Sequence, residues 1–72
     1  MELNLIQKQF GKKLGAAMQA KNLNPYKLGK LTGITQTQIR KTLDGEQNTC
    51  LDSIRKYSIA CDVEPVFFFE WE

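Results

Sequence analysis

The 72-residue sequence contains no histidine and only two cysteines. Histidine is the side chain that enzymes use most often for proton transfer near neutral pH. The chain also lacks a glycine-rich phosphate loop, paired carboxylates in an evident cleft, and a base beside Ser53, Ser58 or either cysteine. These absences predict that the protein is not an enzyme and has no catalytic residues, cofactor or small-molecule substrate.

The two cysteines, Cys50 and Cys61, are expected to lie on one helix. Eleven helical residues separate their Cα atoms by about 16 Å, which exceeds the limit of about 7 Å for a disulfide. Two thiols without another soft ligand nearby also make a poor metal site. We therefore expect neither a disulfide nor a metal, and two thiols in or near the core of a protein from a reducing compartment.

Long apolar runs are missing as well. No run approaches the roughly 18–20 residues that cross a bilayer. The first residues also lack the basic segment, long apolar segment and small-residue cleavage site of a signal peptide. These observations predict a cytoplasmic protein without membrane association.

Charge is distributed unevenly along the chain, although the formal net charge is only +2. Residues 1–43 contain eight basic residues and one acidic residue, a balance of +7. Residues 44–72 contain two basic and seven acidic residues, a balance of −5, and the two balances sum to +2. Solvated helix faces alone can produce such a split, but it is also typical of a protein with one end that faces a polyanion.

The chain has no linker, repeat or low-complexity segment, and we expect a single domain over residues 1–72. Apolar residues recur every four positions between Ile6 and Met18 and predict a helix over about residues 4–21. Gly11 and Gly15 weaken a helix by up to about 1 kcal/mol each relative to alanine, so close packing is expected to favour them.

Two shorter helices are predicted next. Asn22 is a plausible left-handed end for the first helix, and Asn24-Pro25 is a strong start for the second. The second helix is expected to stop at Gly33. The third begins at Thr35, which has capping-box spacing with the glutamine three residues later.

The last two elements are less sharply defined by pattern. The segment Thr49-Cys50-Leu51-Asp52 has a second capping signature and predicts another helix start. The apolar face of that helix is expected to contain Leu51, Ile54, Tyr57, Ser58 and Cys61. The final segment starts at Glu64-Pro65, and its pattern alone does not separate a short helix from a strand.

The short segment between the second and third helices has the features of a helix-turn-helix over about residues 25–43. Gly29 lets the two helix axes approach closely, and Gly33 can supply a positive φ without steric cost. Ile34 and Ile39 are expected to anchor the second of these two helices to the core. A steep crossing that holds the second helix out from the body is what a helix-turn-helix requires.

The outer side of that second helix is expected to present five polar residues: Gln36, Thr37, Gln38, Arg40 and Lys41. Glutamine can read adenine, arginine or lysine can read guanine, and threonine can contact a base edge or the thymine methyl group. A soluble helix that is merely polar outside is the alternative. The turn geometry and the basic half of the chain favour binding to double-stranded DNA.

These features resemble the Cro and phage-repressor helix-turn-helix family, also called the xenobiotic-response-element family, over about residues 10–69. The residues that carry the resemblance are Phe10, Gly11, Leu14, Leu23, 28–30, 33–39, Gly45, Leu51, Ile54, Ala60, Val63, Phe68 and Phe69. The resemblance implies an all-α fold, a five-helix phage-repressor-like domain. It also implies a homodimer that binds a near-palindromic operator in a prokaryotic cell or phage-infected host, as a transcription regulator of phage, plasmid or chromosomal type.

The resemblance also assigns roles to individual positions. Gln36, Thr37, Gln38 and Lys41 would read the groove, and Arg40 would read bases or clamp the backbone. Phosphates would neighbour Lys27, Lys30 and the loop 44–48.

Two departures from the family pattern lie near the helix-turn-helix. Pro25 occupies a place where members often have a glutamine that touches DNA, so that contact should be missing. Members also often pair an arginine with a glutamate at the places that hold Met18 and Leu43 here. Loss of both charges together is compatible with a stable core, because well-packed apolar residues can replace a buried ion pair.

A third departure is the aromatic C-terminus. It has too many aromatic residues for one face of a short element, and Ile59 occupies a place that is usually polar in the family. A protein interface is therefore predicted at Ile59, Val66, Phe67, Phe69 and Trp71. Closure of a small core by three of the four aromatic residues is the alternative. The interface favours self-association of a DNA-binding regulator, or the alternative function of the whole protein as an antirepressor or other protein-interaction module that binds a partner repressor protein.

Overall fold

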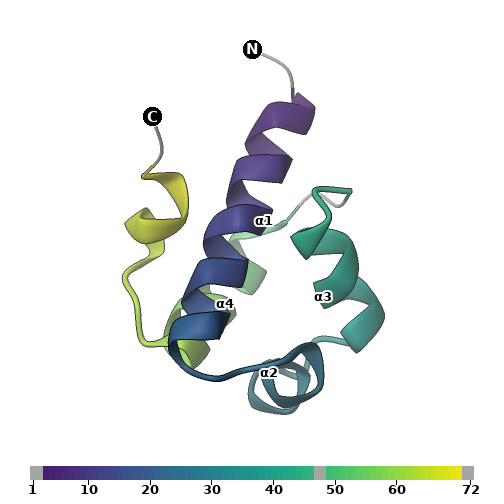
Figure 1. The fold of residues 1–72 in the computed structure, drawn as a ribbon, viewed down its shortest axis with the longest axis vertical. Coiled ribbons are helices and arrows are strands. Elements are labelled where there is room, and N and C mark those ends of the chain that lie inside the picture. The colour runs from purple at the N-terminus through teal and green to yellow at the C-terminus, as the bar shows by residue number, and fades with distance from the viewer. Residues whose placement is uncertain (1–2, 47–48, 71–72) are drawn as a thin grey trace.

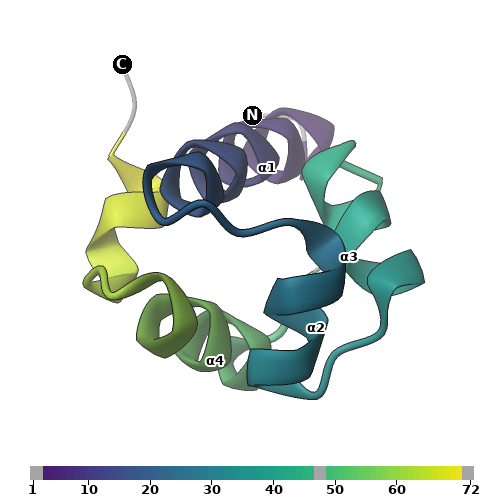
Figure 2. The same ribbon diagram turned by 60° about the horizontal axis from the view of Figure 1, so that its bottom comes forward.

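The computed structural model describes residues 3–46 and 49–70 and contains helices only within those ranges. Four α-helices, α1 (Leu3–Ala20), α2 (Pro25–Thr32), α3 (Gln36–Leu43) and α4 (Leu51–Cys61), precede the 3-10 helix η1 (Pro65–Phe69). In Figure 1, α1 runs through the middle of the molecule, with α3 on one side and η1 on the other. Figure 2 shows α2 between α3 and α4, across from α1. The all-α fold is confirmed.

Local signals set the ends of the first three helices as predicted. Asn22 adopts a left-handed conformation with φ of 55° after α1. The Asn24 side chain accepts a hydrogen bond of 2.7 Å from the Lys27 backbone N–H and caps α2. The Thr35 side chain accepts one of 3.2 Å from the Gln38 N–H and caps α3. These caps satisfy N–H groups that a helix start leaves without a partner.

The predicted cap of α4 is wrong. The N-cap residue is Cys50, and it makes no side-chain capping bond, so Thr49 lies one residue before the cap. Leu51, expected in the buried face, is 85% exposed and is the first residue of α4. Cys50 is also exposed, and only Cys61 is the core thiol that was predicted.

The core forms where α1 meets α3, α4 and η1, and α2 packs against α3 and α4. Its buried apolar residues are Phe10, Leu14, Ala17, Met18, Leu28, Ile39, Ile54, Tyr57, Cys61 and Phe68. Met18 is in this core and Leu43 packs against it, which fits the apolar replacement of the family's charged pair. No helix in the described ranges is long and apolar enough to span a bilayer.

The fifth predicted helix is a single 3-10 segment and not an α-helix. Phe68 is fully buried, and its ring centroid lies 4.9 Å from that of Phe10 on α1. Phe69 also lies near Phe10, with the two ring centroids 5.9 Å apart. The tighter winding of η1 lets a five-residue segment place an aromatic anchor in the core.

Candidate nucleic-acid interface

The turn between α2 and α3 is built from backbone contacts at two glycines. Gly33 has φ of 79° and donates its N–H to the Gly29 carbonyl over 2.7 Å, which ends α2. A Cβ atom on Gly29 would lie 2.8 Å from the Ile34 carbonyl oxygen. The chain can therefore approach α2 this closely only because residue 29 has no side chain.

The Thr32 hydroxyl closes the same turn. It donates to the Leu28 carbonyl over 2.8 Å and accepts from the Ile34 N–H over 3.1 Å. Ile34 packs against the core and Ile39 is fully buried in it. The expected anchoring of α3 is thus confirmed.

The outer side of α3 is open to solvent. All five of its predicted contact residues are exposed: Gln36, Thr37, Gln38, Arg40 and Lys41. None of the ion pairs found among the described residues involves Arg40 or Lys41. The structure therefore presents two uncompensated cations and three hydrogen-bonding side chains on one short helix.

Two further lysines lie on α2. Lys27 and Lys30 are both exposed. The Lys30 ammonium lies 4.7 Å from the centroid of the Tyr26 ring, so this cation sits over an aromatic face near the start of α2. Backbone N–H groups at a helix start and nearby cations form a suitable environment for a phosphate.

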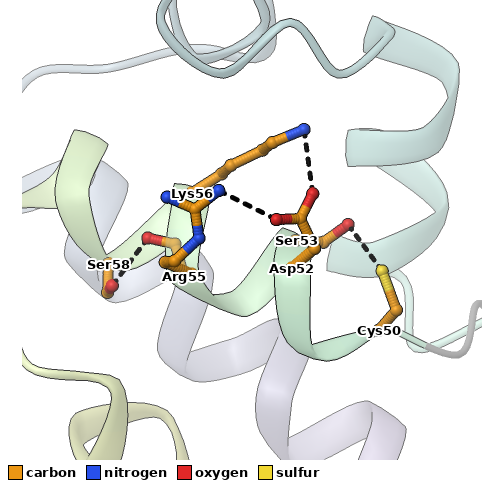
Figure 3. A network of polar contacts seen from close by, with 6 residues as sticks. All are labelled: Cys50, Asp52, Ser53, Arg55, Lys56 and Ser58. Carbon is orange, nitrogen blue, oxygen red and sulfur yellow. Dashed lines mark hydrogen bonds and ion pairs between the residues drawn. The ribbon is translucent and has the colours of Figure 1, made fainter.

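The acidic half of the molecule neutralises its own cations. Arg55 and Lys56 of α4 pair with Asp52 at 2.9 and 3.1 Å (Figure 3). These two partners, Arg55 first, hold the pKa of the Asp52 carboxyl below its usual value. The only other ion pair among the described residues joins Lys21 to Asp62 at 3.4 Å. The exposed cations Lys27, Lys30, Arg40 and Lys41 of α2 and α3 take part in none of the ion pairs found among the described residues.

A small hollow that the sequence did not predict lies between α3 and α4. It has a volume of about 100 Å³, and its lining residues are Ile34, Gln38, Thr42, Thr49, Cys50, Ser53 and Tyr57. Burial raises the pKa of Tyr57 above its usual value. Of these lining residues, only Thr42 carries a signal in the sequence: it is a polar residue on the inward side of α3, three residues after Ile39. In the described ranges, no group of three or more histidine, cysteine or acidic residues is placed to hold a metal ion.

The five residues of the predicted protein interface differ in exposure. Ile59, Val66 and Phe69 are 68%, 57% and 45% exposed. Phe67 is half-buried against the core, and the Lys13 ammonium lies 4.7 Å from its ring centroid. Trp71 lies outside the described residues. The structure places three of the five side chains on the surface and leaves their function as a prediction.

Two short helices joined through Gly33, with the second exposed on its outer side, define a helix-turn-helix protein. The structure is similar to the crystal structure of the restriction-modification controller protein C.AhdI from Aeromonas hydrophila, with a TM-score of 0.84 and 30% sequence identity. The likeness covers 88% of this chain and 96% of that one. Neither the models of known families nor the curated protein sequences give a match. The chain belongs to the Cro and phage-repressor helix-turn-helix family.

Proposed function

We propose that this protein is a transcription regulator that binds double-stranded DNA sequence-specifically through the outer side of α3. The observation that carries the proposal is the state of α3: its inner side is packed, and its outer side presents five exposed polar residues. A helix held in this way can enter the major groove as a rigid body. The similarity to a controller protein supports the regulatory role.

Each contact residue has a proposed role. Gln36, Thr37, Gln38 and Lys41 read base edges, and Arg40 reads a base or clamps the backbone. Lys27 and Lys30 contact phosphates, as does the loop 44–48, of which residues 47 and 48 lie outside the described ranges. Pro25 has no side-chain donor, so the start of α2 contributes only its backbone and neighbouring cations.

We further propose that the protein binds a near-palindromic operator as a homodimer. The exposed apolar residues Ile59, Val66 and Phe69 lie on α4 and η1, and they supply the self-association surface. A symmetric dimer on B-DNA places its recognition helices about 34 Å apart.

Operator selection from a random DNA pool, followed by fluorescence-anisotropy titration at two salt concentrations, tests the proposal. Gln36→Ala and Arg40→Ala should each weaken binding to the selected operator by about 1–3 kcal/mol, roughly 5- to 150-fold. Lys27→Gln should weaken all DNA similarly and reduce the salt slope by about one. Arg55→Ala is the matched control, because Arg55 is an exposed cation on α4 and should leave binding unchanged.

A protein that selects no sequence and binds DNA weakly would contradict the proposal. That result would favour the alternative, an antirepressor that binds a partner repressor. The exposed apolar residues of α4 and η1 favour this alternative because they lie on different elements from the polar side of α3. Truncation after Pro65 is not a usable test, since it would remove Phe68 from the core. Ile59→Ser and Val66→Ser change the same surface without that loss.

A further inference from the structure

The loop between α3 and α4 carries no cation of its own. Residues 44–48 include Asp44 and Glu46 but no lysine or arginine. Both acidic residues are exposed, and neither takes part in an ion pair found among the described residues. A phosphate beside this loop would therefore be repelled by two negative charges. The phosphate contact proposed for the loop needs a positive charge from another element.

Gly45 brings α1 to this loop. Its φ is 75°, and a Cβ atom on it would lie 2.9 Å from the Cα of Lys8 and 2.7 Å from the Lys8 Cγ. The Lys8 backbone nitrogen would be 3.2 Å away. The loop can rest on α1 at this distance only because residue 45 has no side chain. Lys8 is thus the residue of α1 on which the loop lies.

The same loop is tied to the end of α3. The Gly45 N–H donates to the Thr42 carbonyl over 3.1 Å, and the Glu46 N–H donates to the Lys41 carbonyl over 2.9 Å. Figure 1 shows α3 and the loop that follows it beside α1. The two backbone bonds fix the loop between Lys41, which is proposed to read a base, and Lys8 of α1.

The Lys8 ammonium is available to a phosphate. Lys8 is exposed and takes part in none of the ion pairs found among the described residues, although its backbone lies against a loop with two carboxylates. Its charge is therefore neutralised neither by Asp44 nor by Glu46. A lysine ammonium binds phosphate as a compact point charge and does not require the fixed geometry of an arginine.

We propose that Lys8 contacts a DNA phosphate next to the loop 44–48, so that α1 belongs to the DNA interface together with the helix-turn-helix. This inference rests on the proposed DNA-binding function. The Lys8 charge offsets the repulsion by Asp44 and Glu46 and supplies the cation that the loop lacks. Because a phosphate contact carries no sequence information, Lys8 should act on affinity for any DNA and not on the choice of operator.

The test compares Lys8→Gln and Lys8→Arg with the parent protein on the selected operator and on random DNA. We expect Lys8→Gln to weaken binding to both by a similar factor and to reduce the salt slope by about one per bound subunit. The loss should shrink by about threefold per subunit as salt rises from about 0.1 to about 0.4 M. Lys8→Arg keeps the charge and should keep the slope of the parent protein.

Lys13→Gln is the matched control within α1. The Lys13 ammonium lies 4.7 Å from the centroid of the Phe67 ring of η1. In Figure 1, η1 and α3 lie on different sides of α1. Removal of this charge should therefore leave the salt slope unchanged.

Ethylation interference separates a direct contact from a general effect of charge. We expect one phosphate in each half-site whose ethylation weakens binding of the parent protein and has no further effect on Lys8→Gln. Lys8→Gln should also reduce the salt slope in a background with Asp44→Asn and Glu46→Gln. A slope that changes only while both carboxylates are present would overturn the inference, because Lys8 would then only neutralise the loop.

The failure of this inference is distinguishable from the failure of the proposed function. A parent protein that binds DNA with the same salt slope as Lys8→Gln would contradict the role of Lys8 alone. A parent protein that binds neither selected nor random DNA would contradict the proposed function itself.

Discussion

At the scale of single residues, the two thiols differ in environment. Cys50 is exposed at the start of α4, and its Sγ lies 3.3 Å from the Ser53 Oγ (Figure 3). The side-chain hydrogen bond with Ser53 is the main cause that lowers the pKa of Cys50, whereas burial raises the pKa of Cys61. Since the thiolate is the nucleophile, the two cysteines should react with alkylating reagents at very different rates.

Iodoacetamide should therefore modify Cys50 in the native protein and leave Cys61 unmodified. The rate at Cys50 should rise with pH and reach half its maximum below the usual thiol pKa, because the thiolate fraction rises through a lowered pKa. Ser53→Ala should move that midpoint to higher pH. Mass spectrometry of native and urea-unfolded samples measures both sites, and the unfolded sample should show modification of both. Similar native rates at the two cysteines would contradict this picture.

At the scale of elements, the seating of α3 on α1 depends on one of two neighbouring glycines. A Cβ atom on Gly11 would meet backbone oxygens of Thr42 and Leu43 at 2.5 and 2.7 Å. A Cβ atom on Gly15 would meet only the Cδ2 of Leu43, at an ordinary 3.7 Å. Both glycines lie inside α1, so the helix-propensity change on substitution by alanine is the same at each.

We expect Gly11→Ala and Gly15→Ala to change stability in opposite directions. Gly15→Ala should raise the free energy of unfolding by about 0.5–1 kcal/mol through helix propensity. Gly11→Ala should lower it by about 1–3 kcal/mol, because a backbone contact cannot relax as a flexible side chain can. Urea unfolding followed by circular dichroism gives both values. A stabilising Gly11→Ala would show that α3 is not seated on α1 in this way.

The helix-turn-helix was predictable because its signals are local. Asn24, Gly33 and Thr35 act on groups within four residues of themselves, and each does what its residue type predicts. The start of α4 was predicted one residue too early. A capping pattern at Thr49 was present, but the helix begins at Leu51, and pattern reasoning does not show where tertiary contacts begin to cover a helix.

The candidate site was predictable on its outer side only. The polar residues of α3 were predicted on the side of the helix opposite its apolar residues, and such positions are exposed to solvent. The sequence alone therefore indicated Gln36 and Arg40. The surroundings of Thr42 were not predictable, because its carbonyl lies close to Gly11 of α1, far away in the sequence, and its side chain lines an unfilled hollow between helices. The sequence also did not show which aromatic residue of η1 enters the core. Packing against Phe10 of α1 determines that it is Phe68.

At the scale of the whole molecule, the exposed cations of α2 and α3 and the apolar residues of the proposed protein interface occupy different elements. Arg40, Lys41, Lys27 and Lys30 are on α2 and α3, whereas Ile59 and Val66 are on α4 and η1. Two hollows of about 380 and 280 Å³ meet at Ile59, and the second is lined by Leu31, Lys56 and Ala60 besides Ile59 itself. An apolar side chain beside concave surface is suited to a protein contact and not to phosphate.

Self-association should therefore depend on Ile59 and Val66 and not on every exposed apolar residue. In a symmetric dimer each substitution counts twice, so Ile59→Ser should weaken dimerisation by about 3 kcal/mol, roughly 150-fold in Kd. Leu51→Ser is the matched control, because Leu51 is 85% exposed on the same helix but lies at its other end. Sedimentation equilibrium should show a lower average mass for Ile59→Ser and Val66→Ser than for Leu51→Ser or the parent protein. These variants should also lose affinity for a two-half-site operator while retaining affinity for an isolated half-site. A monomeric parent protein, or a mass unaffected by either substitution, would contradict self-association through this surface.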